Sequence, residues 1–86
     1  MNTAFLLMAQ YHGKAVIPIE QVCRDYFSHL SPNKLIAKLS VGEIPIPLVR
    51  IEASQKCAKG NYLLDLANYL DTRIAAAKKE FAAMTK

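Results

Sequence analysis

Hydrophobic and polar positions along the middle of the chain follow a helical repeat. From Glu20 to Leu30 the apolar residues fall on one side of a helix with polar residues on the other, which predicts an amphipathic helix. The apolar positions are Val22, Cys23, Tyr26, Phe27 and Leu30. Ser31 and Pro32 then supply a capping hydroxyl and a proline at the first helical position, so a second helix is expected to run to Val41 and end at Gly42. Two helices separated by at most a tight turn are typical of a helix-turn-helix, here residues 20–42.

The flanking segments also carry start and stop signals. Residues 2–11 are free of helix breakers, and Asn2 or Thr3 can cap them, which predicts an N-terminal helix. Residues 15–19 hold β-branched side chains around a proline and favour a brief edge strand.

After Gly42 the pattern becomes extended. The prolines of Ile44-Pro-Ile-Pro47 exclude a helix, residues 48–52 alternate like a strand, and residues 53–60 form a polar turn that ends at Gly60. Residues 61–64 are expected to return as the second strand of a β-hairpin, so that the wing occupies 44–64. Together with the helices, this predicts one domain over residues 1–86: mainly α with a small β-hairpin, a winged helix-turn-helix with an extra N-terminal helix and a C-terminal helix.

The C-terminal helix is expected at 65–84, capped by Asp65. Its apolar positions recur at helical spacing and predict a stripe that faces the core. The stripe consists of Leu66, Tyr69, Leu70, Ile74, Ala77 and Phe81.

Charge is concentrated in the middle of the chain. The 86 residues carry a net charge of +4, of which residues 31–60 hold +3, while residues 1–30 are neutral and residues 61–86 hold +1. The predicted second helix and the hairpin therefore carry most of the excess positive charge, and they are the elements that would approach DNA phosphates.

The second helix presents a polar face. At about 100° per residue, Leu35, Ile36 and Leu39 point to the core, whereas an arc of about 140° on the other side is exposed. The exposed set is Asn33, Lys34, Ala37, Lys38 and Val41. An asparagine amide can bridge adenine, lysines reach guanine or phosphate, and a small Ala37 permits close approach to a thymine methyl. Asn33, Lys34, Ala37 and Lys38 are thus candidate DNA-binding residues; the alternative is an ordinary solvated helix face.

The hairpin adds candidate phosphate contacts. Lys56 and Lys59, with Ser54 and Gln55, would flank the groove, and Arg50 on the alternating strand is either on the surface or turned to the groove. The alternative is that an exposed loop is simply polar.

Catalytic and metal-binding patterns are scarce. Cys23 and His29 lie about 240° apart on one helix and cannot form a nucleophile–base pair. His12 and His29 lack partners at the spacing of zinc ligands, and the isolated glycines form no phosphate-binding loop. We therefore expect no enzyme activity, no cofactor and no metal. The apolar residues 4–9 are too few to span a membrane and make a poor secretory signal, so a cytoplasmic protein without a membrane partner is expected.

Several blocks of the sequence resemble the pyocin activator protein family. They are residues 1–11, 15–27, 30–35, 42–50, 54–60 and 65–71, which cover nearly the whole chain in order. The middle part, with a Gly-Glu-Ile-Pro step after the second helix, is also similar to excisionase-like and MerR-like winged domains. The resemblance implies a small bacterial transcriptional activator that binds repeated boxes of double-stranded DNA upstream of bacteriocin or prophage gene clusters. It also implies control by a phage-type repressor that is removed after DNA damage.

Alternatives remain open at this point. The same fold would serve an excisionase-like architectural protein that guides site-specific recombination, or an interaction module without DNA binding. A small module binds limited DNA surface, so we expect a homodimer formed through the apolar N-terminal helix or the alanine-rich C-terminal tail. Otherwise the first helix covers the core and the tail frays. Activation would involve contact with RNA polymerase or a change in promoter shape.

Overall fold

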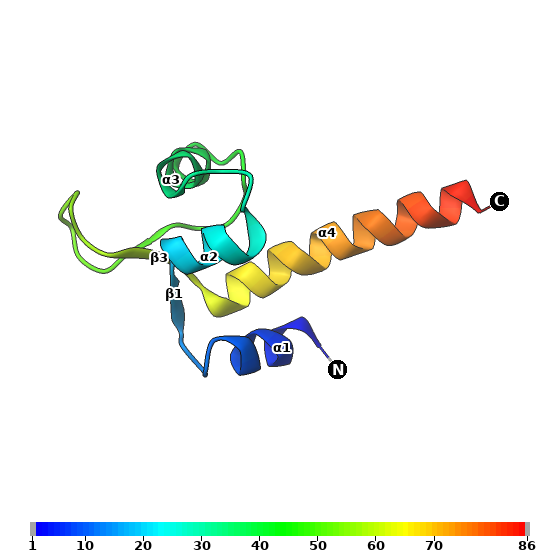
Figure 1. Ribbon diagram of the computed structural model, residues 1–86, viewed down its shortest axis with the longest axis horizontal. Helices are drawn as coiled ribbons and strands as arrows, with labels where there is room; N and C mark the ends of the chain where they lie inside the picture. Colours follow the sequence, from blue (N-terminus) through cyan, green and yellow to red (C-terminus); the bar gives the residue numbers. More distant parts are fainter. Residues whose placement is uncertain (1, 86) are drawn as a thin grey trace.

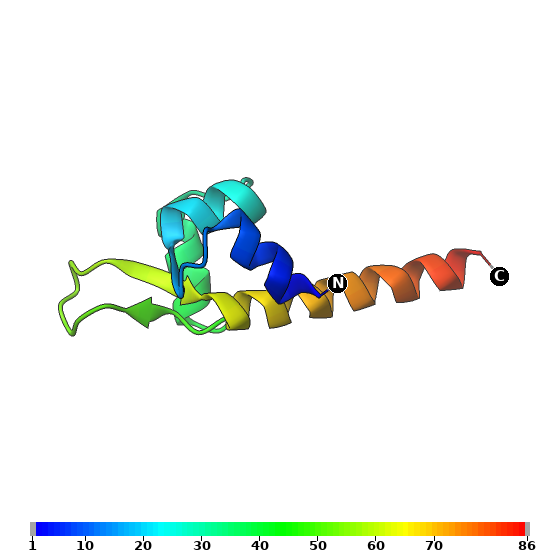
Figure 2. The same ribbon diagram turned by 90° about the horizontal axis from the view of Figure 1, so that it is seen from below.

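The computed structural model describes residues 2–85. Over this range it has four helices and one three-stranded antiparallel sheet (Figure 1). The elements are α1 (Thr3–Gln10), β1 (Val16–Pro18), α2 (Ile19–Tyr26), α3 (Pro32–Ser40), β2 (Val49–Arg50), β3 (Lys59–Tyr62) and α4 (Leu63–Met84). The chain spans 52 × 27 × 18 Å because α4 extends well beyond the other elements (Figures 1 and 2). No helix in the described range is both long and apolar enough to cross a membrane.

Helix α1 begins as predicted, with Asn2 as its cap. The Asn2 side chain accepts a hydrogen bond from the amide of Phe5 at 2.9 Å. The helix packs along the first half of α4, where the Thr3 hydroxyl donates to the Asp71 carboxylate. Leu7 is buried, but Phe5 and Leu6 are 63% and 55% exposed. Helix α4 covers only one face of α1, which leaves these two side chains at the surface of the single chain.

Strand β3 lies at the centre of the sheet, in the order β1-β3-β2. Residues 59–62 form β3, so the predicted strand 61–64 was placed too late, and β2 is shorter than the predicted 48–52. Gly60 pairs with Pro18 on one side and Val49 on the other, and it is not the end of the turn. A Cβ atom at Gly60 would overlap the Ile17 carbonyl oxygen and lie 2.8 Å from Val16. Close approach between strands, and not a turn, explains this glycine.

Helices α2 and α3 pack against each other but are not joined by a tight turn. Helix α2 ends at Tyr26, and residues 27–31 connect it to α3. The Cys23 thiol of α2 donates a hydrogen bond to the Leu30 carbonyl of this connecting segment at 3.1 Å. Phe27, the first residue of the segment, remains in the core. Helix α3 then starts where the sequence predicted, because the Ser31 hydroxyl accepts from the Lys34 amide at 3.2 Å and Pro32 occupies the first turn.

Helix α4 ends at Met84 as predicted but begins two residues earlier than expected. It begins at Leu63, so Asp65 lies in its first turn and is not the cap. Leu66 is buried and Tyr69 and Leu70 are partly buried against the core, as the core-facing stripe requires. Ile74, Ala77 and Phe81 are exposed, because the helix continues past the body of the molecule (Figure 2). The predicted stripe is thus correct only up to Leu70.

One charged hydrogen bond ties the end of α1 to α2. Tyr11 is buried, and its hydroxyl donates to the Asp25 carboxylate at 2.6 Å, while Arg24 approaches the same carboxylate at 3.1 Å. These contacts lower the pKa of Asp25, and burial together with the carboxylate raises the pKa of Tyr11. Beside this pair, the Tyr26 hydroxyl donates to the neutral Gln10 side chain at 2.7 Å.

We predict that Tyr11→Phe lowers the free energy of unfolding by about 1–2 kcal/mol at neutral pH, because it removes a hydrogen bond to a charged acceptor. Folding lowers the pKa of Asp25, so this hydrogen bond adds its full stabilisation above about pH 4. The stabilisation is lost as the pH falls through the pKa of Asp25 in the folded state. Urea unfolding of the variant and the wild type between neutral and acidic pH measures the difference. Tyr26→Phe is the matched control, since it removes a hydrogen bond to an uncharged group and its effect is expected to stay constant with pH. A Tyr11→Phe effect equally constant with pH would contradict the prediction.

Candidate nucleic-acid interface

Helix α3 is anchored by one face and exposes the opposite one. Leu35 and Leu39 are buried at 0% and 6% exposure, as the angular spacing predicts. Asn33, Lys34 and Ala37 are exposed, and Val41 just after the helix is 74% exposed. Ile36 was expected in the core but is only partly buried, since it faces the side of α3 that is turned toward the hairpin.

Lys38 differs from the other predicted residues of α3. Its ammonium group lies 2.7 Å from the Glu43 carboxylate, in an ion pair across the end of the helix. The side chains of Lys38 and Glu43 are 41% and 61% exposed, so water reaches both of them. Lys38 is therefore next to the exposed face but already has an anionic partner, a contact that helical spacing alone does not show.

Two basic residues face each other across the hairpin. Arg50 of β2 pairs directly with Lys59 of β3 in the antiparallel register. Like charges in this position repel, and Lys59 turns back toward the loop, where its ammonium donates to the carbonyls of Gln55 at 2.7 Å and Cys57 at 3.3 Å. Arg50 is exposed and takes part in neither of the two ion pairs found within residues 2–85.

The tip of the hairpin holds the remaining candidates. The Ser54 hydroxyl accepts from the Lys56 amide at 3.1 Å, and the Ser54 carbonyl accepts from the Cys57 amide at 3.2 Å. The Ser54 side chain thus serves to shape the turn. Gln55 and Lys56 are exposed at its outer end.

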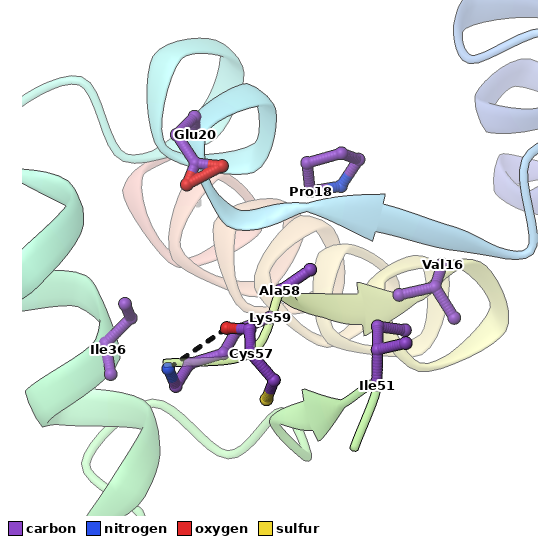
Figure 3. A pocket seen from close by; sticks show the side chains of 8 residues that line it. All are labelled: Val16, Pro18, Glu20, Ile36, Ile51, Cys57, Ala58 and Lys59. Atoms are coloured by element: carbon purple, nitrogen blue, oxygen red, sulfur yellow. Dashed lines mark hydrogen bonds between the residues drawn. The ribbon is translucent and has the colours of Figure 1, made fainter. Parts of the chain in front are cut away.

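A groove of about 260 Å³ separates α3 from the hairpin (Figure 3). Ile36 forms its α3 side, and Ile51, Cys57 and Lys59 form its hairpin side, with Glu20 at the start of α2 beside them. Sequence analysis did not identify Ile36, Ile51 or Glu20 as part of this surface, because only the fold brings three separate segments together. The Glu20 carboxylate makes the groove itself unfavourable for a phosphate.

The predicted residues thus fall into two groups, on two elements that line opposite sides of this groove. Asn33, Lys34, Ala37 and Lys38 belong to α3, and Arg50 and residues 54–59 belong to the hairpin across the groove. Within residues 2–85, no three His, Cys, Asp or Glu side chains are close enough to hold a metal ion.

Comparison with known proteins identifies the family of the chain. The family model described as "Pyocin activator protein PrtN" matches residues 3–77, which is most of the 86 residues. The chain belongs to the pyocin activator family. This is a family of regulatory proteins and not of enzymes, and membership supports a role in activating pyocin genes. Neither the comparison with curated proteins nor that with solved structures gave a match.

If α3 of this pyocin activator family member contacts DNA, Glu43→Gln should strengthen that binding by about three- to tenfold, because it removes a negative charge beside α3 and frees the Lys38 ammonium for a phosphate or base. Fluorescence anisotropy with a labelled duplex, at one fixed salt concentration, measures the change. Asp65→Asn makes the same change of charge in the first turn of α4, outside α3 and the hairpin, and is the control, with a smaller change expected. Weaker binding by Glu43→Gln would mean that the ion pair itself holds α3 in its binding orientation.

Proposed function

We propose that this protein is a sequence-specific double-stranded-DNA-binding transcriptional activator of pyocin-like bacteriocin or prophage gene clusters. In this proposal α2 and α3 act as a helix-turn-helix, α3 is the recognition helix, and the β2–β3 hairpin is the wing. One observation carries it: α3 is fixed to the core by Leu35 and Leu39 while Asn33, Lys34 and Ala37 face solvent. Family membership supports the activator role.

The exposed face of α3 has the chemistry of a base-reading surface. Asn33 carries an amide that can donate to and accept from adenine at the same time, and Lys34 carries a donor for guanine or phosphate. Both lie in the first turn of α3, and helices that enter the major groove generally present their N-terminal residues to the base edges. Ala37 lies one turn further along with only a methyl group, which lets the backbone come close to the bases.

The hairpin has the chemistry of a phosphate-binding wing. Arg50 and Lys59 face each other with like charge, and Lys56 adds a third positive charge at the exposed tip. A phosphate between or beside these side chains would relieve their repulsion, whereas in the free protein Lys59 relieves it only by bonding to loop carbonyls. This supports sequence-independent contacts from the wing and base contacts from α3.

Activation requires more than binding. Contact with RNA polymerase or a change in promoter shape would complete the mechanism, and both would use surfaces other than the exposed face of α3. The apolar side of α1, with Phe5 and Leu6, lies on an element that carries no charged residue and is one such surface.

The proposal is tested by footprinting the protein on DNA upstream of neighbouring bacteriocin or prophage genes, followed by Lys34→Ala. We predict that this variant loses about ten- to hundredfold in affinity for its own site, because a base contact contributes on the order of 1–3 kcal/mol of discrimination. Lys79→Ala removes the same charge from the exposed side of α4 and is the matched control, expected to bind nearly as well as the wild type. Circular dichroism checks that both variants fold.

Lys56→Ala in the same assay separates the roles of the two surfaces. Loss of one phosphate contact should weaken binding to all sequences alike and reduce the salt slope by about one. If Lys34→Ala binds its site as well as the wild type does, α3 is not the recognition helix. If the protein protects only recombination sites beside an integrase gene, the excisionase-like alternative replaces activation.

A further inference from the structure

The second half of α4 has no packing partner within the described chain. The Thr3 hydroxyl of α1 donates a hydrogen bond to Asp71 of α4. After Asp71, every residue from Thr72 to Thr85 is exposed except the half-buried Ala76. Figures 1 and 2 both show this part of the helix extending past all other elements. The apolar side chains of this segment therefore have no surface within the described chain to pack against.

The apolar residues of α4 keep one uninterrupted spacing along its whole length. They are three and four residues apart in turn, which is the heptad repeat of a coiled coil. The positions are Leu63, Ala67, Leu70, Ile74, Ala77, Phe81 and Met84. The first two are buried in the body of the molecule, Leu70 is half-buried, and the last four continue the same stripe into solvent. Phe81 and Met84 are 64% and 76% exposed, so the stripe is covered only where the body reaches it.

The charges beside the stripe are the second observation. Asp71 and Lys78 flank it on one side, and Arg73 and Glu80 flank it on the other. None of the four has an opposite charge three or four residues away in α4, and neither ion pair within residues 2–85 includes any of them, although Asp71 accepts a hydrogen bond from the Thr3 hydroxyl of α1. These positions are the ones that face a second helix in a coiled coil, where they set its direction and register.

We propose that the C-terminal half of α4 forms an antiparallel two-helix coiled coil with the same segment of a second copy of this chain. In the register centred between Ala75 and Ala76, Ile74 packs against Ala77 of the second copy and Leu70 packs against Phe81. The same register places Asp71 beside Lys78 and Arg73 beside Glu80. Two-fold symmetry repeats each contact, which gives four ion pairs between opposite charges.

The alternatives place like charges together. A parallel pair would put Arg73 beside Lys78 of the second copy. An antiparallel pair shifted by one heptad would set Asp71 against Asp71 and Arg73 against Arg73. The shift in the other direction would set Lys78 against Lys78 and Glu80 against Glu80. Only the centred antiparallel register satisfies all four flanking charges, and this charge complementarity is what identifies the second copy as the occupant of the stripe.

The first test is sedimentation equilibrium of the full chain, without DNA, from micromolar to millimolar concentration. We expect a reversible dimer that Phe81→Gln weakens by at least about 100-fold, because each dimer buries two of these rings. Circular dichroism and thermal unfolding at low concentration should show the monomer fold intact, since Phe81 touches none of the core. A wild-type chain that stays monomeric throughout this range would overturn the proposal.

Charge variants test the direction and the register. Arg73→Glu and Glu80→Arg should each weaken their own dimer by roughly tenfold, because each turns two attractive pairs into repulsive ones. The two variants mixed together should form a heterodimer as stable as the wild-type dimer, since every pair is then again attractive. Lys79→Glu makes the same kind of charge change on the side of α4 away from the stripe and is the control, with no change expected.

Other outcomes contradict the proposal in distinct ways. A stronger Arg73→Glu dimer would indicate a parallel pair. A dimer that resists all of these variants but is lost in Phe5→Gln would place the contact on α1. Because no DNA is present, failure here leaves the proposed DNA-binding function untouched, and failure of DNA binding leaves the dimer untouched.

Discussion

The burial of Leu35 and Leu39 under α3 is the packing interaction on which the rest of the account depends. With these two side chains in the core, the rotation of α3 about its axis is fixed, and the opposite face must lie in solvent. The Ser31 cap fixes where the helix starts, which determines that Asn33 and Lys34 lie in its first turn. If either constraint were lost, the same residues would no longer form one exposed surface.

Strand β3 gives this surface its second part. Because Gly60 has no side chain, β1 can approach β3 closely while β2 pairs with its other edge, and the hairpin lies across the groove from α3. The buried Asn61 side chain adds a hydrogen bond of 3.0 Å to the Pro47 carbonyl, which fastens the extended segment between α3 and β2. The strand pairing at Gly60 and the hydrogen bond from Asn61 together position the hairpin across the groove from α3.

Local signals in the sequence predicted the elements that depend on local chemistry. The start of α3, the Asn2 cap and the edge strand at Pro18 were placed correctly because caps and prolines act through neighbouring residues. Gly60 was misplaced because its role depends on a strand more than forty residues earlier. The Lys38–Glu43 ion pair was missed because it depends on how the chain turns after α3. The predicted stripe on α4 faces the core only up to Leu70, because helical periodicity does not reveal where the body of the molecule ends.

The claim that α3 enters DNA is tested most directly by nuclear magnetic resonance of the isotope-labelled chain titrated with its own site. We predict that the backbone amide signals of residues 33–38 shift most, followed by those of residues 54–56 in the hairpin, while the signals of residues 72–85 hardly move. Shifts concentrated on α1 or α4, with the signals of α3 unchanged, would contradict it.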